Sequence, residues 1–316
     1  MSLRIQSLQA RAQLLAQLRQ FFQQRDVMEV CTPVLSQAGG TDPCIEIFHT
    51  RYTGPGYANG LDLYLHTSPE FAMKRLLAEG SGAIYQIAPV FRNAEFGNRH
   101  NPEFTMLEWY RPGFNHHALM QEVAALVCGC LDENLSTQKI SYVELFQNKF
   151  SWNPLHADIS QLVQTTKQYG VYTESLEHRD EYLDLLMSMV IEPELGDKCL
   201  TFVYDYPASQ ASLARLNDEN PLVASRFELY YQGVELANGF HELTDAKEQR
   251  QRFEEENRQR QQRGLRQMPV DERLLKALQQ GMPDCSGVAL GLDRLLMLQQ
   301  GATALSDVLT FPLPEA

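Results

Sequence analysis

Residues 91–105 read FRNAEFGNRHNPEFT, and this stretch decides the fold that we expect for the chain. It is polar and lies between two apolar runs, residues 85–91 and 104–110. Two apolar runs joined by a polar segment predict an antiparallel hairpin with a long loop. Such a loop can hold a phosphate with Arg92 and stack a base against Phe104.

A second segment, residues 285–296, reads CSGVALGLDRLL. It predicts a strand of small and apolar residues that runs into a helix, with Arg294 at the junction. Glycines in such a strand let a ligand or another backbone approach closely. Two interpretations of Arg294 remain open from this pattern: a contact to a ligand, or an ion pair at the start of a helix.

A third segment, residues 227–243, reads FELYYQGVELANGFHEL and predicts a hairpin with a tight turn at residues 231–233. Carboxylates without basic neighbours are costly to bury unless a cation or an ammonium group joins them. Glu228 and Glu235 can therefore share Mg²⁺ that bridges nucleotide phosphates, since this ion prefers a few carboxylates plus phosphate oxygens. The alternative is that both lie on a solvated face of a strand.

The first part of the chain predicts two helices. Residues 3–22 carry apolar side chains at helical spacing, which suits either a core helix or an interface helix. In residues 65–74 we expect Ser68 to be the N-cap and Pro69 to be the first helical residue. Glu70 then lies in the first turn, where the helix dipole favours a carboxylate.

Composition limits the kind of protein. The chain has 316 residues, of which 44% are hydrophobic, and this suits a globular protein with a substantial core. We find no apolar run long enough for a membrane span and no leader, so we expect a cytoplasmic protein. The six cysteines are irregularly spaced, and the pair Cys128 and Cys130 lacks a second pair at zinc spacing. The net charge of −13 weakens a case for general nucleic-acid binding and favours a partner with a basic patch.

Two further regions have a clear pattern. Residues 142–192 are mixed but mainly helical in periodicity, and residues 246–263 predict a charged helix that carries both signs. For the charged helix, a solvated face with ion pairs between turns is the preferred interpretation over a docking surface.

These segments resemble class II lysyl-tRNA synthetases. Residues 25–35 resemble motif 1, residues 91–105 motif 2 and residues 285–296 motif 3. The resemblance implies an α+β fold, namely a class II aminoacyl-tRNA synthetase-like catalytic domain with a mainly antiparallel sheet of about six strands flanked by helices. It implies a single domain over residues 1–316 with a helical insertion at about 142–200, and a homodimer formed through the motif 1 region.

The resemblance also assigns roles to residues. The implied ATP-binding residues are Arg92, Asn93, Ala94, Glu95, His100, Asn101, Phe104, Glu228, Glu235, Leu236, Gly291 and Arg294. The implied amino-acid-binding residues are Ser68, Pro69, Glu70, Glu108, Tyr110, Asn238, Glu242 and Ala289. Arg92, Arg294 and Glu235 are the implied catalytic residues, and Glu228 with Glu235 would hold Mg²⁺.

Motif 1 ends near Pro33, which leaves no room for the anticodon-binding domain, of roughly a hundred residues, that precedes it in lysyl-tRNA synthetases. This shortening, together with residues 106–112 and 286–291, resembles the elongation factor P–(R)-β-lysine ligases, paralogues that modify a protein. The resemblance implies an ATP-dependent ligase that activates (R)-β-lysine as an adenylate and transfers it to a lysine ε-amine of elongation factor P. We expect no tRNA and no membrane partner.

Two positions deserve separate mention because they differ from related patterns. Ala289 lies where lysyl-tRNA synthetases have glycine, and an added methyl group disfavours α-lysine by about 1–3 kcal/mol. Ala94 lies where the family usually has glutamate, and Glu95 follows one residue later. It stays open which of the two meets the nucleotide. Two rival functions also stay open: a lysyl-tRNA synthetase fragment that charges tRNA, and a catalytically silent paralogue that serves as a regulatory binding module.

Overall fold

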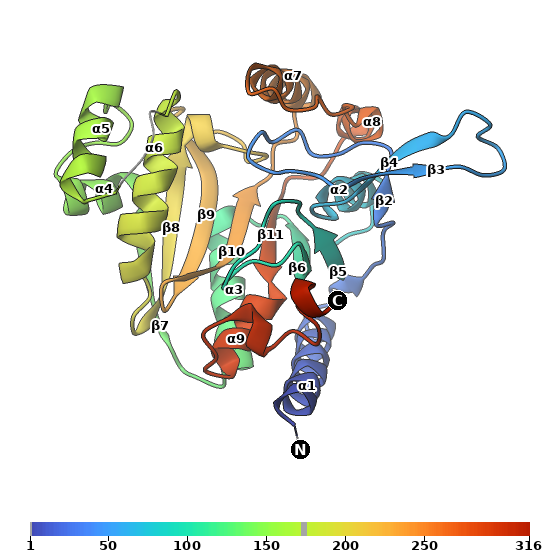
Figure 1. Cartoon of the computed structure of the whole chain (residues 1–316), viewed down its shortest axis with the longest axis horizontal. Helices are drawn as coiled ribbons and strands as arrows, with labels where there is room; N and C mark the ends of the chain where they lie inside the picture. The colour runs from blue at the N-terminus through green and yellow to red at the C-terminus, as the bar shows by residue number, and fades with distance from the viewer. Residues whose placement is uncertain (1, 172–175) are drawn as a thin grey trace. The chain divides into compact units, whose positions relative to one another are not determined.

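The computed structural model describes residues 2–171 and 176–316 (Figure 1). Residues 172–175, which belong to the predicted helical insertion, lie outside the described residues. The chain divides into two compact units, each described by itself below. Unit 1 comprises Met1–Gly113, Thr244–Cys285 and Ala289–Ala316, and unit 2 comprises Phe114–Leu243 and Ser286–Val288.

The main strands of unit 1 form the predicted hairpin. Strand β5 (Ile84–Phe91) pairs antiparallel with β6 (Glu103–Pro112), from Ile84 opposite Tyr110 to Phe91 opposite Glu103. The short strand β1 (Met28–Glu29) adds to β5 in parallel. The hairpin predicted from residues 85–110 is therefore confirmed, and its loop carries the segment between Phe91 and Glu103.

Helix α1 (Leu3–Gln23) packs into the core of unit 1. Its N-cap Ser2 accepts the backbone N–H of Ile5, and its buried residues include Leu14, Leu18 and Phe22. The Phe22 ring stacks on Tyr85 of β5, with 4.2 Å between the centroids. Burying each such side chain stabilises the fold by about 1.5–3 kcal/mol. One side of α1 is thus a core face, as the periodicity allowed.

The rest of unit 1 is a small sheet and a group of helices. The sheet has the order β2 (Leu35–Ser36), β4 (Leu61–Leu65), β3 (His49–Tyr52). The helices are α2 (Glu70–Ala78), α7 (Ala246–Gln262), α8 (Glu272–Gln280), α9 (Leu292–Gln299) and the short 3₁₀ turns η4 (Leu305–Asp307) and η5 (Leu313–Glu315). Helix α8 packs on both α2 and α7, as Figure 1 shows, and α9 packs on β6.

The start of α2 differs by one residue from the prediction. Pro69 is the N-cap, and Glu70 is the first helical residue. The Pro69 carbonyl accepts the backbone N–H of Met73 at 3.0 Å, the first hydrogen bond of the helix, so Pro69 is the residue that precedes it. The Ser68 hydroxyl still accepts the backbone N–H of Glu70 at 3.0 Å.

Unit 2 is built on a sheet with the order β10 (Val234–His241), β9 (Val223–Tyr231), β8 (Cys199–Pro207), β7 (Ser136–Ser141). Strands β9 and β10 are joined by Gln232 and Gly233, both with positive φ, which is typical of a tight hairpin turn. This confirms the second predicted hairpin. Strand β11 (Cys285–Gly291) contributes residues to both units.

The class of the fold is confirmed as α+β, and most of the strand pairs are antiparallel. In the described residues the strands of the main sheet number eight, β1 and β5 to β11, where about six were expected. Two of these strands are short or exposed: β1 has two residues, and β7 has the largely exposed sequence STQKIS. Both pair in parallel with a neighbour, and neither has the apolar alternation by which a strand is recognised.

The helices of unit 2 are α3 (His116–Leu131), α4 (Tyr142–Phe150), α5 (Ile159–Gln168) and α6 (Arg179–Leu186), followed by a π-helical turn η1 (Met187–Ile191) and the 3₁₀ turns η2 (Glu192–Glu194) and η3 (Ala208–Gln210). A cluster around Phe146, Leu162 and Leu183 forms the core between α4, α5, α6 and β8, and α3 packs on β9 and β10. Helical structure is present where the periodicity predicted it. That this region is an insertion into a single domain stays a prediction.

Three findings concern membranes, thiols and metals. No helix among the described residues is long and apolar enough to cross a bilayer. All six cysteines lie in the described part of the chain and are free thiols. Over residues 2–171 and 176–316, no three His, Cys, Asp or Glu side chains are grouped in a way that could hold a metal ion.

Candidate active site

Arg92 lies at the end of β5, where the motif 2 loop begins. Its guanidinium lies over the Phe104 ring, with 5.2 Å between Cζ and the ring centroid. Its Nε is buried and has no hydrogen-bond partner among the described residues. A buried donor without a partner is costly, and a bound anion would satisfy it. Unit 1 therefore brings together the guanidinium predicted to bind phosphate and the ring predicted to stack on the base.

The loop after Arg92 is folded on itself. Asn93 Oδ1 accepts the backbone N–H of Ala94 at 3.0 Å, and Ala94 adopts a left-handed φ of 63°. Glu95 reaches back to Arg92, with 3.8 Å between Oε1 and Nη1. Of the two positions left open by the sequence, it is Glu95 that carries a side chain facing the arginine.

His100 and Arg294 meet in unit 1. Arg294 Nη2 lies 3.0 Å from Nε2 of His100, and Arg294 Nε donates to the Arg99 carbonyl at 3.3 Å. Burial lowers the pKa of His100, and the charge of Arg294 lowers it further. The neutral imidazole can then accept the hydrogen bond that the guanidinium donates. Two of the predicted ATP-binding residues are thus in contact.

Asn101 is held by the protein on both sides. Its Nδ2 donates to the Glu103 carbonyl at 2.6 Å, and its Oδ1 accepts the backbone N–H of Leu313 at 3.1 Å. Its amide therefore ties the loop to the end of the chain in this structure. The sequence pattern contained no signal for this contact.

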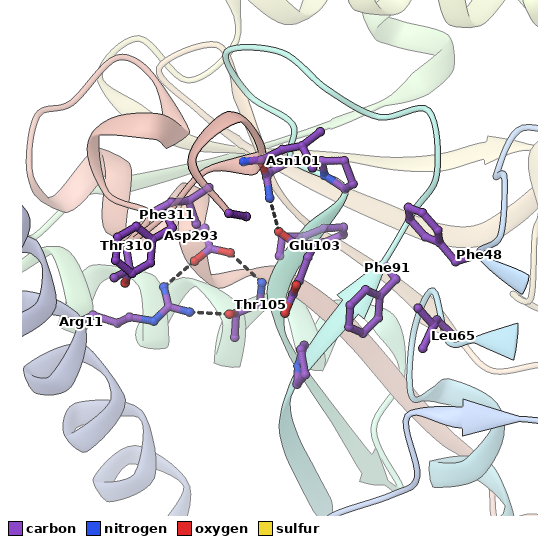
Figure 2. A pocket seen from close by; sticks show the side chains of 16 residues that line it. Arg11, Phe48, Leu65, Phe91, Asn101, Glu103, Thr105, Asp293, Thr310 and Phe311 are labelled. Carbon is purple, nitrogen blue, oxygen red and sulfur yellow. Dashed lines mark hydrogen bonds and ion pairs between the residues drawn. The ribbon is translucent and has the colours of Figure 1, made fainter. Parts of the chain in front are cut away.

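A cavity of about 410 Å³ lies beside this hairpin within unit 1 (Figure 2). Its lining includes Asn101 and Phe104, but not Arg92, His100 or Arg294. On one side Figure 2 shows Arg11, Thr105 and Asp293 joined by hydrogen bonds. Phe48, Leu65 and Phe91 line the other side. The cavity is thus next to the predicted nucleotide residues and does not contain the predicted phosphate-binding arginines.

The predicted amino-acid-binding residues of unit 1 form a network around Glu108. Glu108 is 1% exposed, and its Oε1 accepts the Ser68 hydroxyl at 2.5 Å. Its Oε2 accepts the Tyr110 hydroxyl at 3.1 Å. Since Glu108 and Tyr110 are two residues apart on β6, their side chains emerge on the same face of the strand.

Glu70 has a partner that the sequence analysis missed. The ammonium of Lys74, 1% exposed, lies 2.6 Å from Glu70 Oε1 one helical turn away. A fully buried lysine requires such a carboxylate, because burying an unpaired charge is very costly. The signal was in the sequence, because Glu70 and Lys74 have the i, i+4 spacing of helical ion pairs.

Ala289 and Gly291 belong to β11, and both are half-buried. A Cβ at Gly291 would lie 3.6 Å from the Arg294 side chain, an ordinary contact distance. Glycine at 291 is therefore not required by packing against the arginine.

In unit 2, Glu228 lies at the centre of a buried cluster. Its Oε1 accepts from Arg226 at 2.5 Å, and its Oε2 accepts the Tyr206 hydroxyl at 2.6 Å and the Tyr230 hydroxyl. Burial and the Glu228 charge raise the pKa values of both tyrosines well above their ordinary value. Burial acts to lower the pKa of Arg226, but Glu228 outweighs it and the pKa is raised. Glu228 is therefore a buried acceptor shared by three donors.

The other predicted residues of unit 2 follow on β10 and the turn after it. Asn238 lies opposite Glu228 and accepts from Arg226 Nε at 3.2 Å. Glu235 lies opposite Tyr230, so that Glu228 and Glu235 emerge on one face of the hairpin. Leu236 is buried at the β-bulge that follows Glu235. Glu242 is 1% exposed, and its backbone carbonyl accepts from Arg215 Nε at 3.1 Å.

Arg226, Tyr206 and Tyr230 are the residues of this cluster that sequence reasoning missed. Arg226 and Tyr230 are each two residues from Glu228 on β9, so the period of the strand could have placed them on its face. Tyr206 comes from β8, and only the pairing of the strands brings it to Glu228.

Comparisons with known proteins agree with these motifs. The family model of the tRNA synthetases class II (D, K and N) matches residues 4–315. The elongation factor P–(R)-beta-lysine ligases of Salmonella gallinarum (strain 287/91 / NCTC 13346) and Salmonella dublin are each 51% identical over 314 residues, which is 99% of this chain and 96% of each relative. The chain belongs to this ligase family.

Membership of the elongation factor P–(R)-β-lysine ligases confirms the resemblance drawn from motifs 1 to 3 and from residues 286–291. The match extends over nearly the whole chain, so that both units of the structure fall within the family. The roles of the individual residues remain predictions.

Proposed function

We propose that this protein is an ATP-dependent, AMP-forming ligase that activates (R)-β-lysine and transfers it to a lysine ε-amine of elongation factor P. Relatives that are 51% identical over 99% of the chain carry the name of this activity. The structural observation that carries the proposal is Arg92, which holds a buried, unpartnered Nε beside the Phe104 ring at the motif 2 loop.

In the first step the carboxylate of β-lysine attacks the α-phosphorus of ATP in line. The bond between that phosphorus and the oxygen bridging to the β-phosphate breaks, and pyrophosphate leaves. Arg92 and Arg294 donate to phosphate oxygens, where preorganised donors stabilise the charge that develops. Phe104 packs against the adenine, and neutral His100 orients the Arg294 guanidinium.

In the second step the acceptor amine attacks the carbonyl carbon of the adenylate. The bond from that carbon to the phosphate oxygen breaks, AMP leaves, and the amine proton passes to solvent. No side chain of the protein forms a covalent intermediate, so catalysis rests on positioning and charge stabilisation.

We propose that carboxylates recognise the ammonium groups of the amino acid. In unit 1 Glu108 is held by Ser68 and Tyr110, and Glu70 is held by Lys74. These two carboxylates and one ammonium leave a net negative charge, which suits a substrate that carries two ammonium groups. We also assign amino-acid-binding roles to Asn238 and Glu242.

We assign Mg²⁺ to Glu228 and Glu235. Their carboxylates share one face of the β9–β10 hairpin, and a pair of carboxylates completed by phosphate oxygens suits this ion. The fit is partial, because Glu228 already accepts hydrogen bonds from Arg226, Tyr206 and Tyr230. When bound, Mg²⁺ would offset charge on the phosphates. Arg226 fixes the orientation of Glu228 in either case.

We further propose that the protein is a single catalytic domain, that it forms a homodimer through α1 and the strand after it, and that tRNA is not its substrate. The exposed apolar side chains Leu3, Ile5 and Leu8 on α1 support the assignment of an interface there. The net charge of −13 disfavours a tRNA phosphate backbone and favours an acceptor with basic residues around its lysine.

The deciding experiment is mass spectrometry of purified elongation factor P after incubation with this protein, ATP and (R)-β-lysine. We expect a mass increase of one lysyl residue on the acceptor, and no increase when ATP is omitted. A parallel reaction contains tRNA and α-lysine in place of the acceptor protein. Aminoacylated tRNA without modified elongation factor P would overturn the proposal in favour of a truncated synthetase, and absence of pyrophosphate exchange would favour a silent paralogue.

A further inference from the structure

One face of helix α7 is buried in unit 1, and two of its residues, Glu256 and Arg260, contact residues 41–46. The buried residues of the helix are Gln249, Phe253, Asn257 and Arg260, at intervals of three or four positions. The sequence predicted a charged helix with a solvated face. The helix is present, but the side that carries these four residues is buried. The largest buried side chain of the helix is Arg260, which is 1% exposed.

Arg260 donates hydrogen bonds to backbone carbonyls and forms a longer ion pair with a carboxylate. Its Nη1 donates to the carbonyls of Asp42 at 2.8 Å and Ile45 at 3.2 Å, and its Nε donates to the Arg266 carbonyl at 2.7 Å. The Glu46 carboxylate is farther away, with 3.7 Å between Oε1 and Nη2. Buried carbonyls need donors, and the fork of the guanidinium serves several carbonyls at once.

A second contact from α7 holds the beginning of the same segment. The Thr41 hydroxyl, on a residue that is 2% exposed, donates to the Glu256 carboxylate. Burial raises the pKa of Glu256 to about 7; the hydrogen bond from Thr41 lowers it, Asp42 raises it, and Arg252 and Arg260 lower it. Glu256 and Arg260 are four residues apart, so they project from the same face of α7.

Residues 41–46 are also held by a hydrogen bond within the segment and by close packing just before it. Asp42 Oδ1 accepts the backbone N–H of Cys44 at 2.8 Å, which closes a turn. Just before the segment, a Cβ on Gly39 would lie 2.7 Å from Met268 Cε, so a side chain at 39 would require the Met268 side chain to move. The side-chain amide of Asn257 on α7 holds the Met268 backbone. Its Nδ2 donates to the Met268 carbonyl, and its Oδ1 accepts the Met268 N–H.

The far end of the segment reaches the motif 2 loop. The Glu46 carbonyl accepts the backbone N–H of Asn93 at 2.9 Å, in an antiparallel bridge. Asn93 follows Arg92, whose own backbone N–H donates to the Pro102 carbonyl at 2.9 Å. The backbone around Arg92 is therefore fixed on one side by the hairpin and on the other by residues 41–46.

We propose that Arg260 is a positioning residue for Arg92: by holding residues 42–45 it sets where Glu46 meets Asn93, and so where the Arg92 guanidinium meets the phosphates of ATP. The inference rests on the proposed function and extends it to a residue remote from the substrate. A displacement of about 1 Å at a reacting centre, caused by a distant change, can cost on the order of 100-fold in rate.

The test compares Arg260→Lys with Arg258→Lys in the full-length protein. Arg258 lies on the same helix but is 66% exposed and pairs with the exposed Glu255, so its variant is the matched control. ATP–pyrophosphate exchange gives kcat and the KM values for ATP and β-lysine, and calorimetric titration gives the Kd for ATP. In Arg260→Lys we expect kcat/KM for ATP to fall tenfold to 100-fold with the KM for β-lysine unchanged. The control should match the wild type.

Thr41→Val serves as a second, milder variant, because it removes the hydroxyl that Glu256 holds and keeps the shape of the side chain. It should shift the same ATP parameters in the same direction by a smaller factor. Wild-type ATP parameters in folded Arg260→Lys, or an equal loss of affinity for ATP and β-lysine, would overturn the inference. If Arg260→Lys does not fold, unchanged ATP parameters in Thr41→Val would overturn it. A wild-type protein without exchange activity would instead refute the proposed function.

Discussion

Asp293 Oδ2 accepts the backbone N–H of Thr105 at 2.6 Å, across a separation of 188 residues in the chain. Thr105 follows Phe104, which we assign to adenine, and Asp293 precedes Arg294, which we assign to phosphate. The bond therefore joins the backbone next to Phe104 to the residue next to Arg294. Asp293 Oδ1 also pairs with Arg11 of α1 at 2.5 Å (Figure 2). A single buried carboxylate thus joins the first helix of unit 1 to both nucleotide motifs.

Replacing this carboxylate should destabilise the protein. In Asp293→Asn the amide can still accept from Thr105, but the Arg11 guanidinium loses its charged partner in a site where Asp293 is only 3% exposed. Breaking a buried pair on one side costs about 3–5 kcal/mol, and we expect about 2–4 kcal/mol here because Arg11 is 22% exposed.

Urea-induced unfolding measures this loss as a free energy. The control is Glu255→Gln, which breaks the exposed pair with Arg258 and should cost less than about 1 kcal/mol. Equal stabilities of the Asp293 and Glu255 variants would show that the buried pair contributes nothing particular.

The phosphate assignment predicts the effect of removing Arg92. Arg92→Ala deletes one preorganised charged donor, so adenylate formation should fall by about 10²–10³-fold while the circular dichroism spectrum is unchanged. ATP–pyrophosphate exchange measures the rate, and Arg258→Ala, on an exposed arginine outside the site, is the control. Near-normal exchange in a folded Arg92 variant would refute the assignment.

Glu256 predicts a pH dependence of stability. Burial raises its pKa from 4.5 to about 7, so between these values the folded state binds more protons than the unfolded state. Its stabilising contribution is present below pH 4.5 and is lost as the pH rises through 7. The loss is on the order of 3 kcal/mol, since one pKa unit corresponds to about 1.4 kcal/mol.

In Glu256→Gln the side chain can still accept the Thr41 hydroxyl, but it no longer titrates. The difference in free energy of unfolding between this variant and the wild type should therefore move in favour of the variant from pH 5 to pH 8. Chemical unfolding at several pH values measures it. A difference that is constant with pH would mean that Glu256 does not titrate in this range.

The methyl group of Ala289 leads to a prediction about the preference for β-lysine over α-lysine. Ala289→Gly removes one methyl group at the position where lysyl-tRNA synthetases have glycine, so activity with α-lysine should rise relative to β-lysine. The expected shift is roughly tenfold to 100-fold, the range for one methyl group in a pocket. Exchange kinetics with each isomer measure kcat/KM. An unchanged ratio would mean that another residue selects the isomer.

Much of the site could be predicted from local sequence. The hairpin that carries Arg92 and Phe104 was predicted because an apolar strand, a polar loop and a second apolar strand follow one another directly. The turn at Gln232 and Gly233 was predicted for the same reason. The family itself was readable from these motifs, and the comparisons confirm it.

Other features had a local signal that was not used. Lys74 is one turn after Glu70, and Arg226 is two residues before Glu228. Glu228 was interpreted as lacking a basic neighbour, although the period of the strand places Arg226 on the same face.

The sequence by itself determined which residues can carry the chemistry, because strand alternation, turn geometry and motif spacing act between residues that are close in the chain. Only the tertiary structure decided what holds them in place. Arg260 lies 218 residues from Asp42, and Asp293 lies 188 residues from Thr105. Such contacts form between a buried donor and the carbonyl or carboxylate that packing brings next to it. Burial makes the pairing necessary, because a polar group left unpaired inside the protein loses its hydrogen bonds to water without replacing them.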